Sequence, residues 1–128
     1  MAIRLRLNHM AIQVRDKDVS AEFYGRVLRL PEIAMGGTRA HVRWFAIGPD
    51  TSIHLIQGDF GSTQVKRSTH YCIASDDLAG SIRHLDREGV AYCDYDGIPG
   101  KIAVRADGVK SVYLQDPDGY WIEISEDY

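Results

Sequence analysis

The amino-acid sequence predicts an α+β fold made of two βαβββ modules, and three observations indicate it. Residues 7–16 (LNHMAIQVRD) and 68–77 (STHYCIASDD) share a His, a small residue followed by Ile, and an Asp at matching positions. Each segment is followed by apolar residues at helical spacing. Each half closes with a Pro-Asp turn and a hydrophobic strand, GPDTSIHLI and DPDGYWIEI. An internal repeat accounts for all three.

The first half begins with an expected strand over residues 3–14, because polar and apolar side chains alternate up to Val14. Asp16 or Asp18 is placed to cap a helix whose apolar side chains recur until Pro31 ends the run. The other expected elements are a turn at 36–38, a strand at 39–47, a turn at 48–51 and a strand at 52–57.

The second half repeats this order. Asp76 or Asp77 is placed to cap a helix that carries Leu78, Ile82 and Leu85 on one face and ends at Gly89. The other expected elements are a strand at 69–74, strand fragments within 90–106, a strand at 111–115, a turn at 116–119 and a strand at 120–125.

The predicted organisation is a first module over residues 1–60, a polar linker at 61–67 and a second module over 68–128. The two modules are expected to form a single domain, over residues 5–126. The chain of 128 residues, 45% hydrophobic and 26% charged, has the composition of a globular protein with a core of its own.

Charge and hydropathy argue against two classes of partner. The net charge is −3, and the basic clusters are no larger than pairs, so neither a nucleic acid nor an anionic membrane is an expected partner. The sequence has no run of about 18 apolar residues and no signal-peptide pattern, so we expect a cytoplasmic protein. Cys72 and Cys93 have no CxxC spacing and are expected to be reduced and buried.

Each half carries one His or acidic residue in its first strand and one in its last. These are His9 and His54, then His70 and Glu123. The carboxylate of Glu123 stands between two isoleucines, with Trp121 on its own side of the strand, so it is costly to bury unless it is paired or binds a cation. Three His and one Glu fit a divalent metal ion, namely Zn, Ni, Fe(II), Mn or Co.

A structural role is the alternative for each of these residues. A single His on a strand is more often a structural or surface residue than a ligand, and Glu123 taken alone fits a solvent-facing position equally well. We interpret His41 and His84 as structural or solvated, because neither has an ionisable counterpart in the other half.

Four segments carry a resemblance to a known family: LNHMAIQVRD, SAEFYGRVLRL, STHYCIASDD and SVYLQDPDGYWIEI. Over nearly the whole chain the sequence resembles the vicinal oxygen chelate superfamily, which includes glyoxalase I, fosfomycin- and bleomycin-resistance proteins and ring-cleaving dioxygenases. The resemblance implies a U-shaped, roughly eight-stranded mixed sheet around a divalent metal, a small-molecule substrate and a homodimer. The metal ligands it implies are His9, His70 and Glu123, with His54 at the fourth position, where bacterial glyoxalase I usually has Glu.

The first functional hypothesis is a glyoxalase-like lyase or isomerase. Its metal would hold two adjacent substrate oxygens while Glu123 moves a proton, and His54 would be a ligand or a second base. Trp121 would line the substrate pocket, and Tyr113 is a further candidate there. The stretch HLIQGDF lacks the Asn found in glutathione-using relatives, which argues against glutathione as the substrate.

Two alternatives stay open. His9, His70 and Glu123 form the two-His-one-carboxylate set of Fe(II) oxygenases, with His54 or Tyr113 as an acid–base residue. Typical ring-cleaving members carry four modules, which argues against this class. A protein that only binds a small molecule, such as an antibiotic, is the other alternative, although such members tend to lack the metal ligands.

Overall fold

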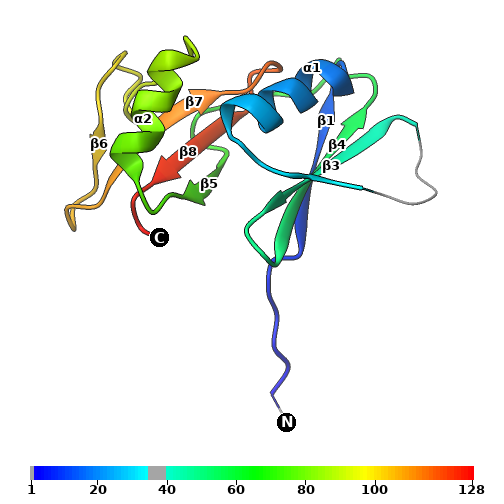
Figure 1. Ribbon diagram of the computed structural model, residues 1–128, viewed down its shortest axis with the longest axis horizontal. Coiled ribbons are helices and arrows are strands. Elements are labelled where there is room, and N and C mark those ends of the chain that lie inside the picture. Colours follow the sequence, from blue (N-terminus) through cyan, green and yellow to red (C-terminus); the bar gives the residue numbers. More distant parts are fainter. Residues whose placement is uncertain (1, 35–39) are drawn as a thin grey trace. The chain divides into compact units, whose positions relative to one another are not determined.

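The computed structural model describes residues 2–34 and 40–128. The chain divides into two compact units, Met1–Gly61 and Ser62–Tyr128, and each contains a four-stranded sheet (Figure 1). Each unit has the order strand, helix and then three strands. The predicted α+β class with two βαβββ modules is therefore confirmed, while the turn predicted at 36–38 lies outside the described residues.

The sheet of the first unit has the strand order β1-β4-β3-β2. Strand β1 runs parallel to β4, while β3 runs antiparallel to both β4 and β2. The parallel pair needs a crossover, and helix α1 begins it directly after β1. The elements are β1 (His9–Val14), α1 (Lys17–Glu22), the π-helical turn η1 (Phe23–Val27), β2 (Glu32–Ile33), β3 (Val42–Ile47) and β4 (Thr51–Gln57).

Helix α1 begins at the predicted cap. The Asp16 carboxylate accepts hydrogen bonds from the backbone N–H groups of Asp18 and Val19, at 2.9 and 3.2 Å. The spacing of apolar residues predicted one continuous α-helix. The chain instead widens after α1 into η1, where the Leu28 N–H donates to the Phe23 carbonyl. The aromatic residues Phe23 and Tyr24 of this turn are buried.

The two faces of the first sheet differ in chemistry. Helix α1 packs on β3 and β4, and the core contains the fully buried side chains of Val14, Tyr24, Ile53 and Leu55. Because side chains alternate along a strand, His54 points to the opposite face from its neighbours Ile53 and Leu55.

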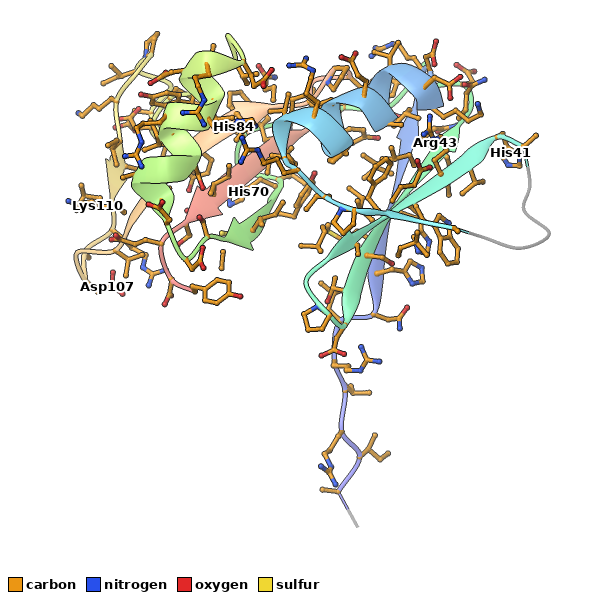
Figure 2. All side chains as sticks on the ribbon, in the orientation of Figure 1. His41, Arg43, His70, His84, Asp107 and Lys110 are labelled. Carbon is orange, nitrogen blue, oxygen red and sulfur yellow. The ribbon has the colours of Figure 1, made fainter. Side chains whose placement is uncertain are left out.

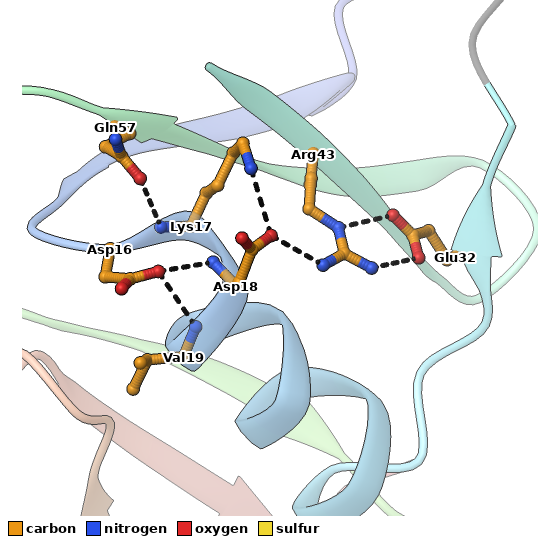
Figure 3. Close-up of polar contacts among 7 residues, drawn as sticks. All are labelled: Asp16, Lys17, Asp18, Val19, Glu32, Arg43 and Gln57. Carbon is orange, nitrogen blue, oxygen red and sulfur yellow. Dashed lines mark hydrogen bonds and ion pairs between the residues drawn. The ribbon is translucent and has the colours of Figure 1, made fainter. Parts of the chain in front are cut away.

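An ion-pair network links helix α1 and edge strand β2 to strand β3 (Figure 3). The Arg43 guanidinium donates two hydrogen bonds to the Glu32 carboxylate, at 2.8 and 2.7 Å, and one to Asp18 at 3.0 Å. The hydrogen bond from Arg43 holds the pKa of Glu32 below its ordinary value, and those from Lys17 and then Arg43 do so for Asp18.

The second unit repeats this plan, with the strand order β5-β8-β7-β6 and β5 parallel to β8. The Asp77 carboxylate caps α2 by accepting from the Gly80 N–H at 2.9 Å, and Gly89 follows the helix with a φ of +68°. The core includes Leu85, Leu114 and Ile122. The elements are β5 (His70–Ala74), α2 (Leu78–Arg87), β6 (Ala103–Val104), β7 (Lys110–Gln115) and β8 (Trp121–Ser125).

Two sequence predictions are wrong in detail. The first strand begins at His9 rather than at residue 3, because its pairing with β4 starts with His9 opposite Ser52, and Ile3 and Leu5 are 89% and 93% exposed. Cys72 is exposed rather than buried, whereas Cys93 is buried as predicted. Within the described residues, no helix combines the length and apolar character needed to cross a membrane.

Candidate metal centre

In the first unit, His9 and His54 lie against each other on the sheet face away from α1. Their ring centroids are 4.1 Å apart and their planes differ by 12°. The other face of His54 stacks on Trp44, at 3.7 Å and 1°. Strand register explains this three-ring stack, because His54 lies opposite Trp44 on one side and opposite Ala11, two residues beyond His9, on the other.

Hydrogen bonds orient both imidazoles of this stack. His9 Nδ1 lies 2.7 Å from the Asn8 side-chain oxygen, which only accepts, so Nδ1 carries the proton and Nε2 keeps its lone pair. His54 Nε2 lies 3.0 Å from the Ser52 hydroxyl. Burial, and then the neighbouring His9, lower the pKa of His54, so this ring is neutral at neutral pH.

The stack limits how these two histidines bind a common ion. An imidazole nitrogen binds a metal along its lone pair, which lies in the ring plane. The planes of His9 and His54 are within 12° of parallel, so an ion in the plane of one ring lies outside the plane of the other. In this arrangement the two rings do not converge on one ion.

In the second unit, His70 of β5 and Glu123 of β8 form a close pair; Figure 2 labels His70 on its strand. His70 Nε2 is 3.2 Å from Glu123 Oε1, and the two side chains are 21% and 19% exposed. His70 Nδ1 lies 2.7 Å from the Arg67 carbonyl oxygen. A carbonyl only accepts, so Nδ1 carries a proton, and Nε2 is the nitrogen that faces the carboxylate.

This geometry fits a divalent cation. Two ligand atoms that bind one ion at about 2.1 Å and at right angles are about 3 Å apart, close to the Nε2–Oε1 separation of 3.2 Å. A carbonyl that fixes the far nitrogen of a His is the usual companion of a metal-binding imidazole. Without an ion, the same contact is a hydrogen bond only when Nε2 carries a proton.

Tyr113 and Cys72 complete the surroundings of Glu123. Both lie opposite Glu123 in the sheet, and both interact electrostatically with its carboxylate. Desolvation, and then the charge of Glu123, raise the pKa of Tyr113 to about 12 and that of Cys72 to about 11, although Cys72 as a whole residue is exposed. Both groups therefore stay protonated at neutral pH.

Trp121 lies on the same face as Glu123, two residues earlier on β8, and opposite His70 in the register. Its indole is covered by the Arg67 guanidinium, whose carbon lies 5.0 Å from the ring centroid. Trp121 and Glu123 therefore share one face of β8, while the contact of Trp121 with a substrate stays a prediction.

The structure therefore brings the four predicted ligands together as two pairs, one in each unit. Among the described residues, no three His, Cys, Asp or Glu side chains form a cluster that fits one ion, so a shared site for His9, His54, His70 and Glu123 stays a prediction. His41 is exposed and His84 is buried on α2, and neither belongs to the His9–His54 or the His70–Glu123 pair; Figure 2 labels both.

Sequence reasoning missed three residues that shape these pairs: Trp44, Ser52 and Arg67. The internal repeat contained a signal for Trp44 and Ser52. Trp44 precedes the Gly-Pro-Asp turn by nearly the same number of residues as Tyr113 precedes the Asp-Pro-Asp turn. Ser52 lies two residues before His54, as Trp121 lies two before Glu123. Arg67 had none, since its role depends on a loop conformation.

The fold and these two pairs define a class, the proteins built from paired βαβββ modules with His and carboxylate side chains on the sheet faces. Residues 6–124 match the model of the Glyoxalase/Bleomycin resistance protein/Dioxygenase superfamily. The chain belongs to this superfamily, whose members generally use divalent metals, bind small molecules and form dimers.

Individual relatives differ in activity. The uncharacterized protein YwbC of Bacillus subtilis is 28% identical over 131 residues, covering 92% of this chain and 94% of YwbC. The metallothiol transferase FosB of Shouchella clausii is 30% identical over 122 residues, covering 92% of this chain and 77% of FosB. Among solved structures, oxidase ChaP-H2 superposes with a TM-score of 0.78 at 24% identity, covering 98% and 96% of the two chains. The last similarity shows the fold alone.

Proposed function

We propose that this chain is a divalent-metal-dependent enzyme whose ion is held by His9, His70 and Glu123. Its substrate is a small molecule with two adjacent oxygens, and its reaction is a proton transfer of the lyase or isomerase type. The two modules act as one domain in this proposal, and the ligands come from one chain or from two copies of a dimer.

The observation that supports this proposal most is the His70–Glu123 pair. A carbonyl anchors Nδ1 of His70, and Nε2 lies 3.2 Å from a carboxylate oxygen, a spacing that suits two ligands of one ion. His9 has the same preparation, because Asn8 fixes its Nδ1 and leaves Nε2 available. The family and the metallothiol transferase relative support metal use.

When bound, the ion supplies Lewis-acid stabilisation of negative charge that develops on the substrate oxygens. The residues of the chain then have separate tasks. Glu123 neutralises one positive charge of the ion and is the candidate base for the proton that moves. Tyr113 lies opposite it in the sheet. Tyr113 keeps its proton up to high pH and so serves as a hydrogen-bond donor. Trp121 offers an apolar wall beside them.

His54 is assigned a positioning role rather than a ligand role. Its ring is stacked between His9 and Trp44, with one nitrogen on Ser52. This stack keeps the exposed His9 ring in place while its own neutral imidazole stays off the ion. A second base at His54 would have to act through the Ser52 hydroxyl, which is its hydrogen-bond partner.

Oxidation by molecular oxygen is the second candidate. With His54 in the stack, the remaining ligands are two His and one carboxylate, the set that leaves room for both a chelating substrate and oxygen at Fe(II). An oxidase among the structural neighbours has the same fold. An oxygen electrode with the Fe(II)-loaded protein and a panel of α-hydroxycarbonyl compounds and catechols separates the two reactions, because only oxidation consumes oxygen.

Elemental analysis tests the metal site itself. Protein purified without chelator is expected to carry about one divalent ion per chain, while His70→Ala and Glu123→Ala lose it. His84→Ala is the matched control, since this His of the same unit belongs to neither pair. Equal metal content in wild type and both site variants contradicts the proposal and favours a small-molecule binding protein. Light scattering at micromolar concentration tests the proposed dimer.

A further inference from the structure

The side chain of Arg67 is held in place by three contacts on the face that carries His70 and Glu123. Its guanidinium lies over the Trp121 ring, with its carbon 5.0 Å from the centroid. Its Nε donates a hydrogen bond to the Tyr95 carbonyl. It also packs on Gly97, where a Cβ would come within 3.1 to 3.3 Å of guanidinium atoms. A long side chain that is normally mobile is therefore fixed here.

This positioned cation has no counter-ion in the described part of the chain. None of the ion pairs there includes Arg67, and its single hydrogen bond uses Nε, so the terminal nitrogens keep their donors. The neighbouring acid, buried Asp94, is already engaged by the Ile98 N–H at 2.9 Å and by Lys101 at 3.6 Å. An oriented guanidinium with free donors is suited to bind an anion.

Arg67 is also linked directly to the proposed metal centre. Its carbonyl accepts the hydrogen bond that orients His70. Its side chain covers Trp121, which pairs with His70 in the register and precedes Glu123 by two residues. Alternate residues on one face of a strand lie about 7 Å apart, and this is the spacing between Glu123 and Trp121, the residue whose ring the guanidinium covers.

We infer that Arg67 anchors a carboxylate of the substrate, with Trp121 as the platform for the body of the molecule. The inference rests on the proposed function and narrows its substrate class to small, flat compounds that carry two adjacent oxygens and, about 7 Å away, a carboxylate. The paired donors of Arg67 bind that carboxylate through two hydrogen bonds, and the adjacent oxygens reach the metal ligands.

The first test uses metal-free protein and therefore does not depend on the metal site. Benzoate and benzamide are added separately to nitrogen-15-labelled, chelator-treated protein, and the indole N–H signal of Trp121 is followed by NMR. Trp121→Phe identifies this signal among the two tryptophans of the chain. Benzoate is expected to shift it and benzamide to leave it in place. Arg67→Gln abolishes the shift, whereas Arg83→Gln, a control on α2 whose side chain faces Asp77, retains it.

The second test measures specificity in the zinc-loaded protein by calorimetry without oxygen. The wild type is expected to bind 3,4-dihydroxybenzoate about tenfold to a hundredfold more tightly than 3,4-dihydroxybenzamide, the effect of charge-assisted hydrogen bonds. Arg67→Gln reduces this preference to near one, and Arg67→Lys retains part of it, because the charge stays while the planar fork is lost.

Metal content, measured on the same samples, separates the two proposals. The inference is wrong, and the proposed metal enzyme stands, if zinc is retained but the wild type binds the acid and the amide with equal affinity. The same holds if zinc is retained and Arg67→Gln still binds the acid more tightly than the amide. If zinc is not retained but benzoate still shifts the Trp121 signal through Arg67, the anion site stands and the metal proposal fails.

Discussion

Two substitutions at His54 separate a metal ligand from a stacking residue. His54→Phe keeps a flat ring between His9 and Trp44 but removes both nitrogens, while His54→Ala removes the ring as well. If His54 only positions His9, the Phe variant keeps nearly full metal affinity and the Ala variant loses part of it. If His54 is a ligand, both variants lose affinity to a similar, larger extent.

The expected magnitude follows from the contacts. The ring stacks at 4.1 Å on His9 and at 3.7 Å on Trp44, and each such contact contributes about 0.5–1.5 kcal/mol beyond burial. Losing the contact with His9 frees that exposed ring, so His54→Ala is expected to weaken metal binding by about tenfold, in the range seen when the support of a ligand is removed. The Phe variant loses the hydrogen bond to Ser52, which costs about 1 kcal/mol of folding stability but leaves His9 in place.

Competition with a chromophoric zinc chelator measures the three affinities, and urea unfolding of the same samples reports their stability. The expected order of metal affinity is wild type close to Phe, with Ala below both. A Phe variant that binds zinc as weakly as the Ala variant, while unfolding at a similar urea concentration to wild type, refutes the positioning role and restores His54 to the ligand set.

Two further predictions concern the second unit and the ion-pair network. Tyr113→Phe is expected to lower zinc affinity by up to about tenfold, because its hydroxyl interacts with the Glu123 carboxylate, whereas Tyr95→Phe, which removes a hydroxyl from the ring that packs on Tyr113, leaves affinity unchanged. Arg43→Met is expected to cost about 1 kcal/mol of unfolding free energy at pH 7 for its pair with the partly exposed Glu32. Because the folded-state pKa of Glu32 is lowered, this stabilisation is present above the ordinary carboxyl pKa and is lost as pH falls through the lowered value, so equal losses at pH 7 and pH 3 in urea unfolding contradict it.

Most of the fold was predictable because local signals agreed with the repeat. Asp16 and Asp77 cap helices as their positions predicted, and the alternation around His54 and Glu123 placed both side chains on the face away from the helix. The strand boundary at the N-terminus was not predictable, since alternation in residues 3–8 satisfies the pattern of a strand without supplying a neighbouring strand to pair with.

The candidate site was predictable as a list of residues but not as a geometry. The position of each ligand along its strand indicated the face of the sheet on which it lies, but not the orientation of its ring. The stacking of His9 on His54 depends on Trp44, and the tautomer of His70 depends on the carbonyl of Arg67. Both contacts come from segments that the pattern of ligands does not include.

The repeat also explains why the two halves have different chemistry. The register places Ala11 and Trp44 opposite His54, and in the same way Cys72 and Tyr113 opposite Glu123. The same strand register therefore positions an aromatic stack in the first unit and a carboxylate paired with His70 in the second. With two neutral imidazoles and one carboxylate, a divalent ion keeps one positive charge, which favours a substrate that binds through an oxygen anion. A carboxylate at the position of His54 would remove that charge, so His54→Glu is expected to strengthen metal binding while weakening the binding of an anionic chelating substrate.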